Sequence, residues 1–124
     1  MGRGKKHIEY TKTAVDGKVL GSKGQARRYQ ELKILEAGGY ISDLDAEVPF
    51  LLQNEESGIY VRELRGKKVR TYTADAVYRE KERPEILVVE EYKGRRITAE
   101  SSLRMSLFKA LYPQHCFRLF QRKK

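Results

Sequence analysis

The feature that most constrains the fold of this 124-residue chain is a continuous apolar run at residues 86–89, which leads directly into charged residues. Four consecutive apolar side chains are typical of a central strand buried on both faces, since a half-exposed strand would alternate apolar and polar residues. The sequence continues as Glu90-Glu91-Tyr92-Lys93 and then reaches Gly94. Such a strand needs other strands on both edges and helices over both faces of its sheet.

The rest of the chain contains the helices and strands that such a sheet requires. Ser22 and Thr98 are predicted helix N-caps, and two helices are predicted to end at Gly38 and Tyr112. Their predicted buried faces consist of Ala26, Tyr29, Leu32 and Leu35 in the first helix and of Leu103, Leu107, Ala110 and Leu111 in the second. Strands are predicted at residues 46–53, 59–64, 69–79, 86–93 and 115–120. Residues 22–120 are therefore expected to form one α/β domain, with a mixed central sheet flanked by helices.

Both ends of the chain are basic. Residues 1–21 are expected to form a basic arm with a short hairpin around Asp16-Gly17, and residues 121–124 a basic tail. The formal net charge of +9 favours a polyanionic partner, with nucleic acid as the first candidate. A ribosomal protein or a membrane-surface binder would carry a similar charge, so the charge alone identifies no function.

The cysteine and hydropathy patterns indicate a cytoplasmic protein. The single cysteine, Cys116, excludes an intrachain disulfide and fits a reducing compartment. No window of the sequence approaches the roughly 20 apolar residues of a membrane-spanning helix. We therefore expect no association with a membrane.

The charged end of the predicted central strand is the main candidate site. Side chains alternate between the two faces of a strand, so Glu91 and Lys93 share one face while Glu90 and Tyr92 point to the other. Asp75 lies between two alanines in the preceding predicted strand, although Asp is depleted in strands. If these two strands are neighbours, the carboxyl groups of Asp75 and Glu91 meet.

Two adjacent carboxylates repel each other unless a proton or a cation joins them. Their oxygen atoms suit a hard divalent cation such as Mg²⁺ or Mn²⁺. Such an ion would polarise a phosphodiester and lower the pKa of a bound water, while Lys93 would orient that water or stabilise charge in the transition state. The competing interpretation is that the Glu-x-Lys triplet is a chance ion pair at a solvated strand edge.

The same residues resemble the PD-(D/E)xK nuclease superfamily, whose core order is αβββαβ. Asp75 followed by Glu91-Tyr92-Lys93 matches the signature, with Ala74 where the signature has proline. The resemblance implies a restriction-endonuclease-like fold in which Asp75 and Glu91 bind metal and Lys93 is catalytic. Further similarity, to a family of small phage- and prophage-encoded nuclease-like proteins, lies in residues 22–29, 72–78 and 88–94, in Phe108 and in Tyr112-Pro113.

Two positions depart from the pattern of that family. The family usually has Glu in the first helix where this chain has Gln25, and it tends to have Gln at the first strand where this chain has Glu47. Gln25 is therefore a further catalytic candidate, acting through a metal-bound water or through its carbonyl oxygen. Glu47 is a third candidate metal ligand, and its alternative interpretation is an exposed acid at the entry to a strand.

Basic side chains around this site are candidates for contacts with nucleic-acid phosphates. Arg95 and Arg96 directly follow the candidate strand, and Lys67 and Lys68 lie in a predicted turn. Arg28 is expected on the outer side of the first helix, and Arg104 matches a basic family position on the second helix. Taken singly, each is more often a solvated surface charge.

The sequence thus predicts a Mg²⁺- or Mn²⁺-dependent deoxyribonuclease that hydrolyses phosphodiester bonds in the cytoplasm of a bacterial host. The phage relatives imply a role in DNA recombination, repair or packaging, and a branched-DNA resolvase fits a small, basic, homodimeric protein. The second hypothesis is a non-catalytic nucleic-acid-binding module on the same fold, which Gln25 favours. A third, a small basic assembly protein that binds RNA, leaves Asp75 and Glu91 unexplained.

Overall fold

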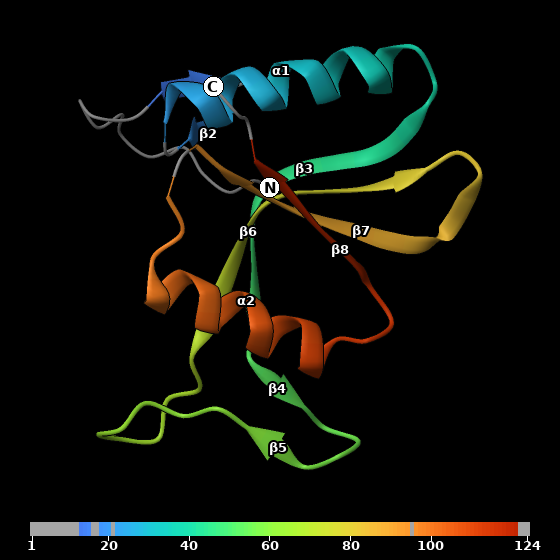
Figure 1. The fold of residues 1–124 in the computed structure, drawn as a ribbon. Coiled ribbons are helices and arrows are strands. Elements are labelled where there is room, and N and C mark those ends of the chain that lie inside the picture. Colours follow the sequence, from blue (N-terminus) through green and yellow to red (C-terminus); the bar gives the residue numbers. More distant parts are fainter. Residues whose placement is uncertain (1–12, 16–17, 21, 95, 122–124) are drawn as a thin grey trace.

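A computed structural model of the protein describes residues 13–15, 18–20, 22–94 and 96–121. Its central sheet contains, in spatial order, β3 (Ile41–Leu51), β6 (Thr71–Glu80), β7 (Arg83–Lys93) and β8 (Cys116–Gln121). Helix α1 (Lys23–Ala37) covers one face of the sheet and α2 (Ala99–Leu111) the other (Figure 1). The chain therefore has the expected mixed α/β fold, and its core elements follow the order helix, three strands, helix, strand.

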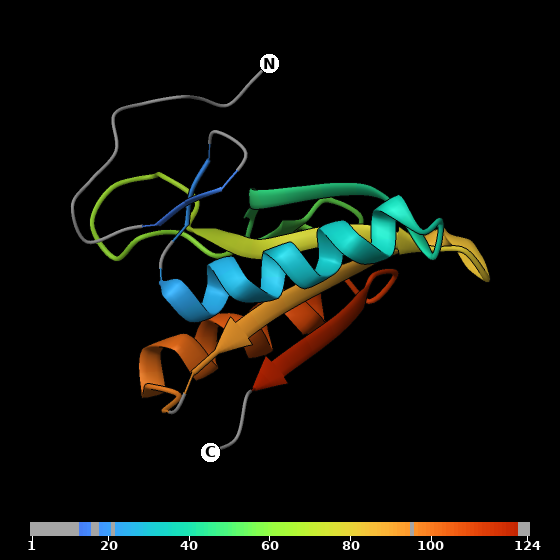
Figure 2. The ribbon, with the colours of Figure 1, turned by 90° about the horizontal axis from the view of Figure 1, so that it is seen from above.

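Strand β7 is a central strand, as the apolar run predicts. It pairs antiparallel with β6 and parallel with β8, while β6 pairs antiparallel with β3 on its other edge. Val88 and Val89 are both buried, one in the core beneath α1 and the other in the core beneath α2. A parallel pair needs a crossover connection, and α2 supplies the one between β7 and β8. Figure 2 shows α1 lying along the face of the twisted sheet that is opposite to α2.

Helix α1 begins as predicted, but its buried face ends one turn early. The Ser22 side chain accepts a hydrogen bond from the Gln25 backbone N–H at 3.0 Å, and so acts as the predicted N-cap. Ala26 and Leu32 are buried, whereas Leu35 is exposed. The four predicted residues are three apart, and each such step falls about 60° short of a full helical turn. Over the three steps from Ala26 to Leu35 the shortfall reaches about 180°, so Leu35 points roughly opposite to Ala26.

The predicted buried face of α2 is half right, since Leu111 is buried and Leu107 packs half-buried against the core. Met105 and Phe108 are buried together with Leu111, whereas Leu103 and Ala110 are exposed. Aromatic packing decides the rotation of the helix. The Phe108 ring lies 5.0 Å from that of Phe50 and 4.9 Å from that of Tyr72, measured between ring centroids. These contacts bury the Phe108 side of α2 and leave one of its leucines in solvent.

The remaining strands form two small sheets outside the central one. The predicted strand at 59–64 does not join the central sheet, because only β5 (Ile59–Tyr60) is regular and it pairs with β4 (Gln53–Asn54). Strand β3 begins at residue 41 rather than 46. The antiparallel pairing of β1 (Thr13–Val15) with β2 (Lys18–Leu20) agrees with the predicted hairpin. Its turn at 16–17, the rest of the arm at 1–12 and the tail at 122–124 lie outside the described residues.

Candidate active site

Three acidic residues occupy matching positions on three neighbouring strands. Ala46 pairs with Ala76 and Val48 with Ala74, so Glu47 of β3 lies opposite Asp75 of β6. On the other side of β6, Ala76 pairs with Glu90, so Glu91 of β7 is the next residue in register with Asp75. The sequence predicted that Asp75 and Glu91 would be neighbours, and the sheet places them so. The convergence of Glu47 with them could not be read from the sequence.

The backbone is irregular at this row of acids. The regular pairing of β6 with β7 ends at Ala76, and Asp75 Oδ2 instead accepts a hydrogen bond from the Tyr92 backbone N–H at 2.6 Å. Glu47 has a φ of 55°, in the left-handed region that non-glycine residues seldom adopt. Such a conformation costs about 1–3 kcal/mol and tends to cluster at functional sites. The irregularity therefore coincides with the candidate site.

Glu91 and Lys93 lie on the α2 side of the sheet, in accordance with the period of two. The Tyr72 hydroxyl donates a hydrogen bond to Glu91 Oε1 at 2.6 Å, and Lys93 Nζ lies 3.3 Å from Glu91 Oε2. Together they border a cleft of about 310 Å³. Its other lining residues are Thr73 of β6 and Thr98, Glu100, Ser101 and Arg104 at the N-terminal end of α2.

Gln25 of α1 reaches the site through Glu47. Its side-chain Nε2 donates a hydrogen bond to Glu47 Oε2 at 2.7 Å, and Gln25 itself is buried. The two positions at which the sequence departs from the resembled family are therefore in direct contact. Glu47 is half-buried, so the alternative interpretation of it as an exposed acid is not supported.

The electrostatics of the site disfavour two ionised carboxylates. Burial, together with the nearby charges of Glu91 and Glu47, raises the pKa of Asp75 to about 7, against the lowering effect of the Tyr92 N–H. Burial also raises the pKa of Glu91, although the Tyr72 hydroxyl and Lys93 oppose that shift. The pKa of the Tyr72 phenol is raised by burial and by Glu91, so this hydroxyl stays protonated and donates. A cation at the site would relieve the repulsion between the carboxylates.

The donor set fits a hard cation, within limits that the structure sets. Asp75, Glu91 and Glu47 all offer carboxylate oxygens, which suit Mg²⁺ or Mn²⁺. Across the described part of the chain, no three His, Cys, Asp or Glu side chains are already grouped as a complete metal-ligand set. Magnesium commonly takes only one or two protein carboxylates and completes its shell with water or phosphate oxygens, so Asp75 and Glu91 would suffice.

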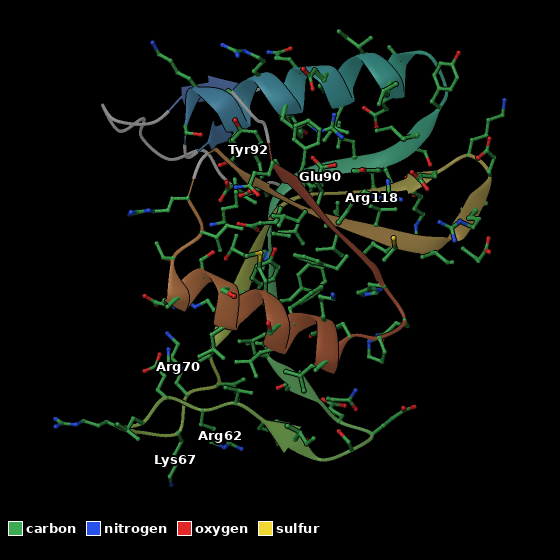
Figure 3. All side chains as sticks on the ribbon, in the orientation of Figure 1. Arg62, Lys67, Arg70, Glu90, Tyr92 and Arg118 are labelled. Atoms are coloured by element: carbon green, nitrogen blue, oxygen red, sulfur yellow. The ribbon has the colours of Figure 1, made fainter. Side chains whose placement is uncertain are left out.

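On the opposite face of β7, Glu90 forms a buried ion pair with α1. Arg28 donates through Nε to Glu90 Oε2 at 2.7 Å and through Nη2 to Oε1 at 3.0 Å, and the Tyr78 hydroxyl donates to Oε1 at 2.8 Å. The Arg28 guanidinium also lies 4.1 Å from the centroid of the Phe120 ring. Figure 3 shows Glu90 and Tyr92 in the layer beneath α1. This network joins the helix that carries Gln25 to the strand that carries Glu91.

The candidate phosphate-binding residues have different surroundings. Arg28 corrects the expectation that it lies outward, because its pairing with Glu90 leaves its side chain only 17% exposed. Arg104 faces the cleft, as the resemblance implied, and pairs with Glu100 at 3.0 Å. Arg96 is exposed at the entry to α2. Lys67 and Lys68 are exposed on a loop far along the chain from α2, and Arg95 lies outside the described residues.

Sequence reasoning missed Tyr72 as a partner of Glu91. Tyr72 precedes Asp75 by three residues in β6, and an odd spacing in a regular strand places two side chains on opposite faces of the sheet. However, Ala74 belongs to the core beneath α2 and Ala76 to the core beneath α1, so the alternation is interrupted at Asp75. No sequence signal marks this interruption except the rarity of Asp within a strand. Glu90 was likewise missed, and its only signal was a charge inside a buried strand.

The fold and the site together define a mixed α/β protein with a row of three acids across neighbouring strands of its central sheet and a lysine at the end of β7. The chain belongs to the family described as "Protein of unknown function (DUF1064)", whose model matches residues 5–122. Comparisons with curated proteins and with solved structures found no match. Among the described residues, no helix is long and apolar enough to cross a membrane.

Proposed function

We propose that this protein is a divalent-metal-dependent deoxyribonuclease of the PD-(D/E)xK type. The observation that carries the proposal is the row of Glu47, Asp75 and Glu91 across three strands, with Lys93 Nζ 3.3 Å from Glu91. Burial of Asp75 and Glu91 makes their joint ionisation unfavourable without a cation. A purely structural ion pair between Glu91 and Lys93 would not need a second and a third acid beside it.

Each residue of the site has a distinct task in this proposal. Asp75 and Glu91 hold Mg²⁺ or Mn²⁺, and the bound ion supplies Lewis-acid activation of the phosphate and of a water. Lys93 orients the attacking water or stabilises the negative charge of the transition state. Gln25 holds Glu47 in place through the 2.7 Å hydrogen bond, and Glu47 would be a third residue available to hold the ion.

The proposed substrate is DNA. The net charge of +9 favours a polyanion, and Arg104 lines the cleft, where it would contact a phosphate. Arg96 is exposed two residues before Thr98, which also lines the cleft. The resemblance to phage nuclease-like proteins favours recombination, repair or packaging of DNA in the cytoplasm of a bacterial host. We further propose a homodimer acting on branched DNA, since one domain of this size covers few base pairs.

A second candidate function is a non-catalytic nucleic-acid-binding module on the same fold. The observation that favours it is the neutral Gln25 side chain, which contributes an amide rather than an acid next to Glu47. An amide binds a divalent cation more weakly than a carboxylate does. In that case the protein binds DNA but cuts none.

The test is cleavage of labelled linear, single-stranded and four-way DNAs in Mg²⁺, in Mn²⁺ and in EDTA. The proposal predicts cutting that requires the metal and falls about 10²–10³-fold in Lys93→Ala, the usual loss when one transition-state donor is removed. Lys81→Ala is the matched control, because this exposed lysine lies in the turn between β6 and β7. DNA binding without cleavage under every condition would refute the nuclease and support the non-catalytic binding module.

A further inference from the structure

A basic projection lies outside the candidate active site, at residues 62–70, and we call it the basic finger. It contains the five cations Arg62, Arg65, Lys67, Lys68 and Arg70 and the single acid Glu63, a net charge of +4. All six of these side chains are exposed. None of the five cations makes an ion pair with a carboxylate in the described part of the chain. Their charge is therefore available to a partner.

The basic finger has a defined backbone. Arg62 and Val69 form an antiparallel bridge, and the Glu63 backbone N–H donates to the Lys68 carbonyl at 2.9 Å. The Arg62 side chain adds a further link between the two arms of the finger, because its Nη1 donates to the Lys67 carbonyl at 2.6 Å. Gly66 has a φ of 98°, which only glycine adopts readily, and it permits the tight reversal at the tip.

The base of the finger is joined to the central sheet. The Val61 N–H donates to the Leu52 carbonyl at 2.9 Å, and the Leu52 N–H donates to the Arg70 carbonyl at 2.8 Å. Arg70 leads directly into β6, whose residues Tyr72 and Thr73 line the cleft. Hydrogen bonds and chain continuity thus fix the finger relative to the candidate active site.

The tip of the finger carries an exposed leucine among the cations. Leu64 is 94% exposed, more than any other large apolar residue in the described part of the chain. Its neighbours in sequence are Glu63 and Arg65. An isolated exposed leucine is ordinary, but this one is held at the end of a hydrogen-bonded projection whose charge attracts phosphates.

The direction of the finger suits a ligand that also reaches the cleft. In Figures 1 and 2 the finger lies on the same side of the molecule as the N-terminal end of α2, which lines the cleft. Figure 3 shows Arg70 on the side of the finger nearer α2 and Lys67 on the opposite side. A rod-like polyanion could therefore contact both the finger and the cleft.

We infer that the basic finger binds duplex DNA, with its cations on the phosphates and Leu64 inserted as a wedge between base pairs. Aliphatic side chains inserted in this way unstack a base step and bend the duplex. Single-strand binders instead stack bases on aromatic rings, and the tip between Glu63 and Lys68 has none. The inference rests on the proposed function only for the choice of DNA as ligand and does not require that the protein cuts it.

The wedge is tested with 2-aminopurine placed at the flexible TA steps of a duplex, in EDTA so that cleavage does not interfere. We expect wild type to raise the fluorescence, because unstacking relieves quenching, and to do so more on a TA-rich duplex than on a stiff A-tract. Leu64→Ala should abolish the rise and weaken binding about tenfold, the effect of losing most of a leucine's burial. Leu64→Lys should also abolish it, although the added charge favours phosphate contact. Ile34→Ala, an exposed aliphatic residue of α1, is the control and should behave as wild type.

The phosphate contacts are tested by the salt dependence of binding. The double variant Lys67→Ala/Lys68→Ala should lower the slope of log affinity against log salt by about 2, one for each lost contact. Lys81→Ala/Lys109→Ala removes the same charge from other exposed positions and should leave the slope unchanged. All five variants alter only exposed side chains, so their thermal unfolding should match that of wild type.

The outcomes separate this inference from the proposed nuclease activity. A fluorescence rise that survives in Leu64→Ala overturns the wedge, and so does a wild-type protein that binds no duplex at all. An unchanged salt slope in Lys67→Ala/Lys68→Ala overturns the phosphate contacts. If Leu64→Ala changes only the self-association of the protein, the tip contacts a second copy and the inference is wrong. Insertion without metal-dependent cleavage would support the finger while refuting the nuclease.

Discussion

The buried ion pair between Arg28 and Glu90 should be the most sensitive polar contact in the fold. Glu90 is only 1% exposed, and Arg28 contributes two of its hydrogen bonds, at 2.7 and 3.0 Å. Among the described residues, Arg28→Ala leaves that buried carboxylate with the Tyr78 hydroxyl as its one hydrogen-bond partner. Breaking a buried pair from one side costs about 3–5 kcal/mol. A domain stable by about 5–15 kcal/mol would lose a large part of its stability.

The assay is urea and thermal unfolding followed by circular dichroism. For a chain of this size, 1 kcal/mol shifts Tm by about 4 °C, so Arg28→Ala should lower Tm by about 12–20 °C. Arg27→Ala is the matched control, because Arg27 is the adjacent exposed arginine of the same helix and should change stability by less than about 0.5 kcal/mol.

A double variant shows whether the buried charge is the cause. Glu90→Gln in the Arg28→Ala background removes the unpaired charge and keeps an acceptor for Tyr78, so it should restore part of the lost stability. The reasoning is refuted if Arg28→Ala unfolds like Arg27→Ala, or if the double variant is less stable than Arg28→Ala alone.

Three further predictions concern the site itself. Burial and Glu91 raise the pKa of Asp75 to about 7, so between about pH 4 and about pH 7 the metal-free fold holds one proton more than the unfolded chain. The free energy of unfolding should therefore fall as pH rises through that window. Urea unfolding curves at pH 5 and pH 8 without metal test this. Gln25→Glu replaces the amide that donates to Glu47 by a second carboxylate, so it should cost about 1–3 kcal/mol without metal and strengthen Mn²⁺ binding; calorimetry that finds weaker binding would contradict this. Gly24→Ala places a methyl group against the Tyr92 phenol and should destabilise the protein by about 1–3 kcal/mol despite alanine's better helix propensity; unchanged denaturation would show that Tyr92 moves aside freely.

The sequence predicted the order of the core elements because their signals are local. Ser22 and Thr98 both act as the predicted caps, and the apolar run at 86–89 lies in a central strand. The rotation of α2 was not predictable, because Leu103 and Phe108 are both apolar and only the aromatic partners on the sheet decide which is buried. The extent of β3 was missed because three of residues 41–45 are polar and interrupt the strand pattern, although Ile41 is buried and Leu44 packs against the core beneath α1.

The candidate site was predictable in part. The period of two placed Glu91 and Lys93 together, and strand order placed Asp75 beside Glu91. The contact between Gln25 and Glu47 depends on how α1 lies over the sheet and on a left-handed backbone at Glu47. Neither follows from local pattern, because both are set by packing between segments far apart in the sequence.

The central claim is that a divalent cation binds at Asp75 and Glu91, and Mn²⁺ titration followed by electron paramagnetic resonance at pH 8 measures this directly. Above the pKa of about 7 the Asp75 carboxyl is ionised and competition from protons is small. Wild type should bind Mn²⁺ and Asp75→Ala should bind it at least about tenfold more weakly, the usual range for losing one site group. Asp43→Ala, an exposed acid on β3, should bind as wild type does. Equal affinity in wild type and Asp75→Ala would contradict the account.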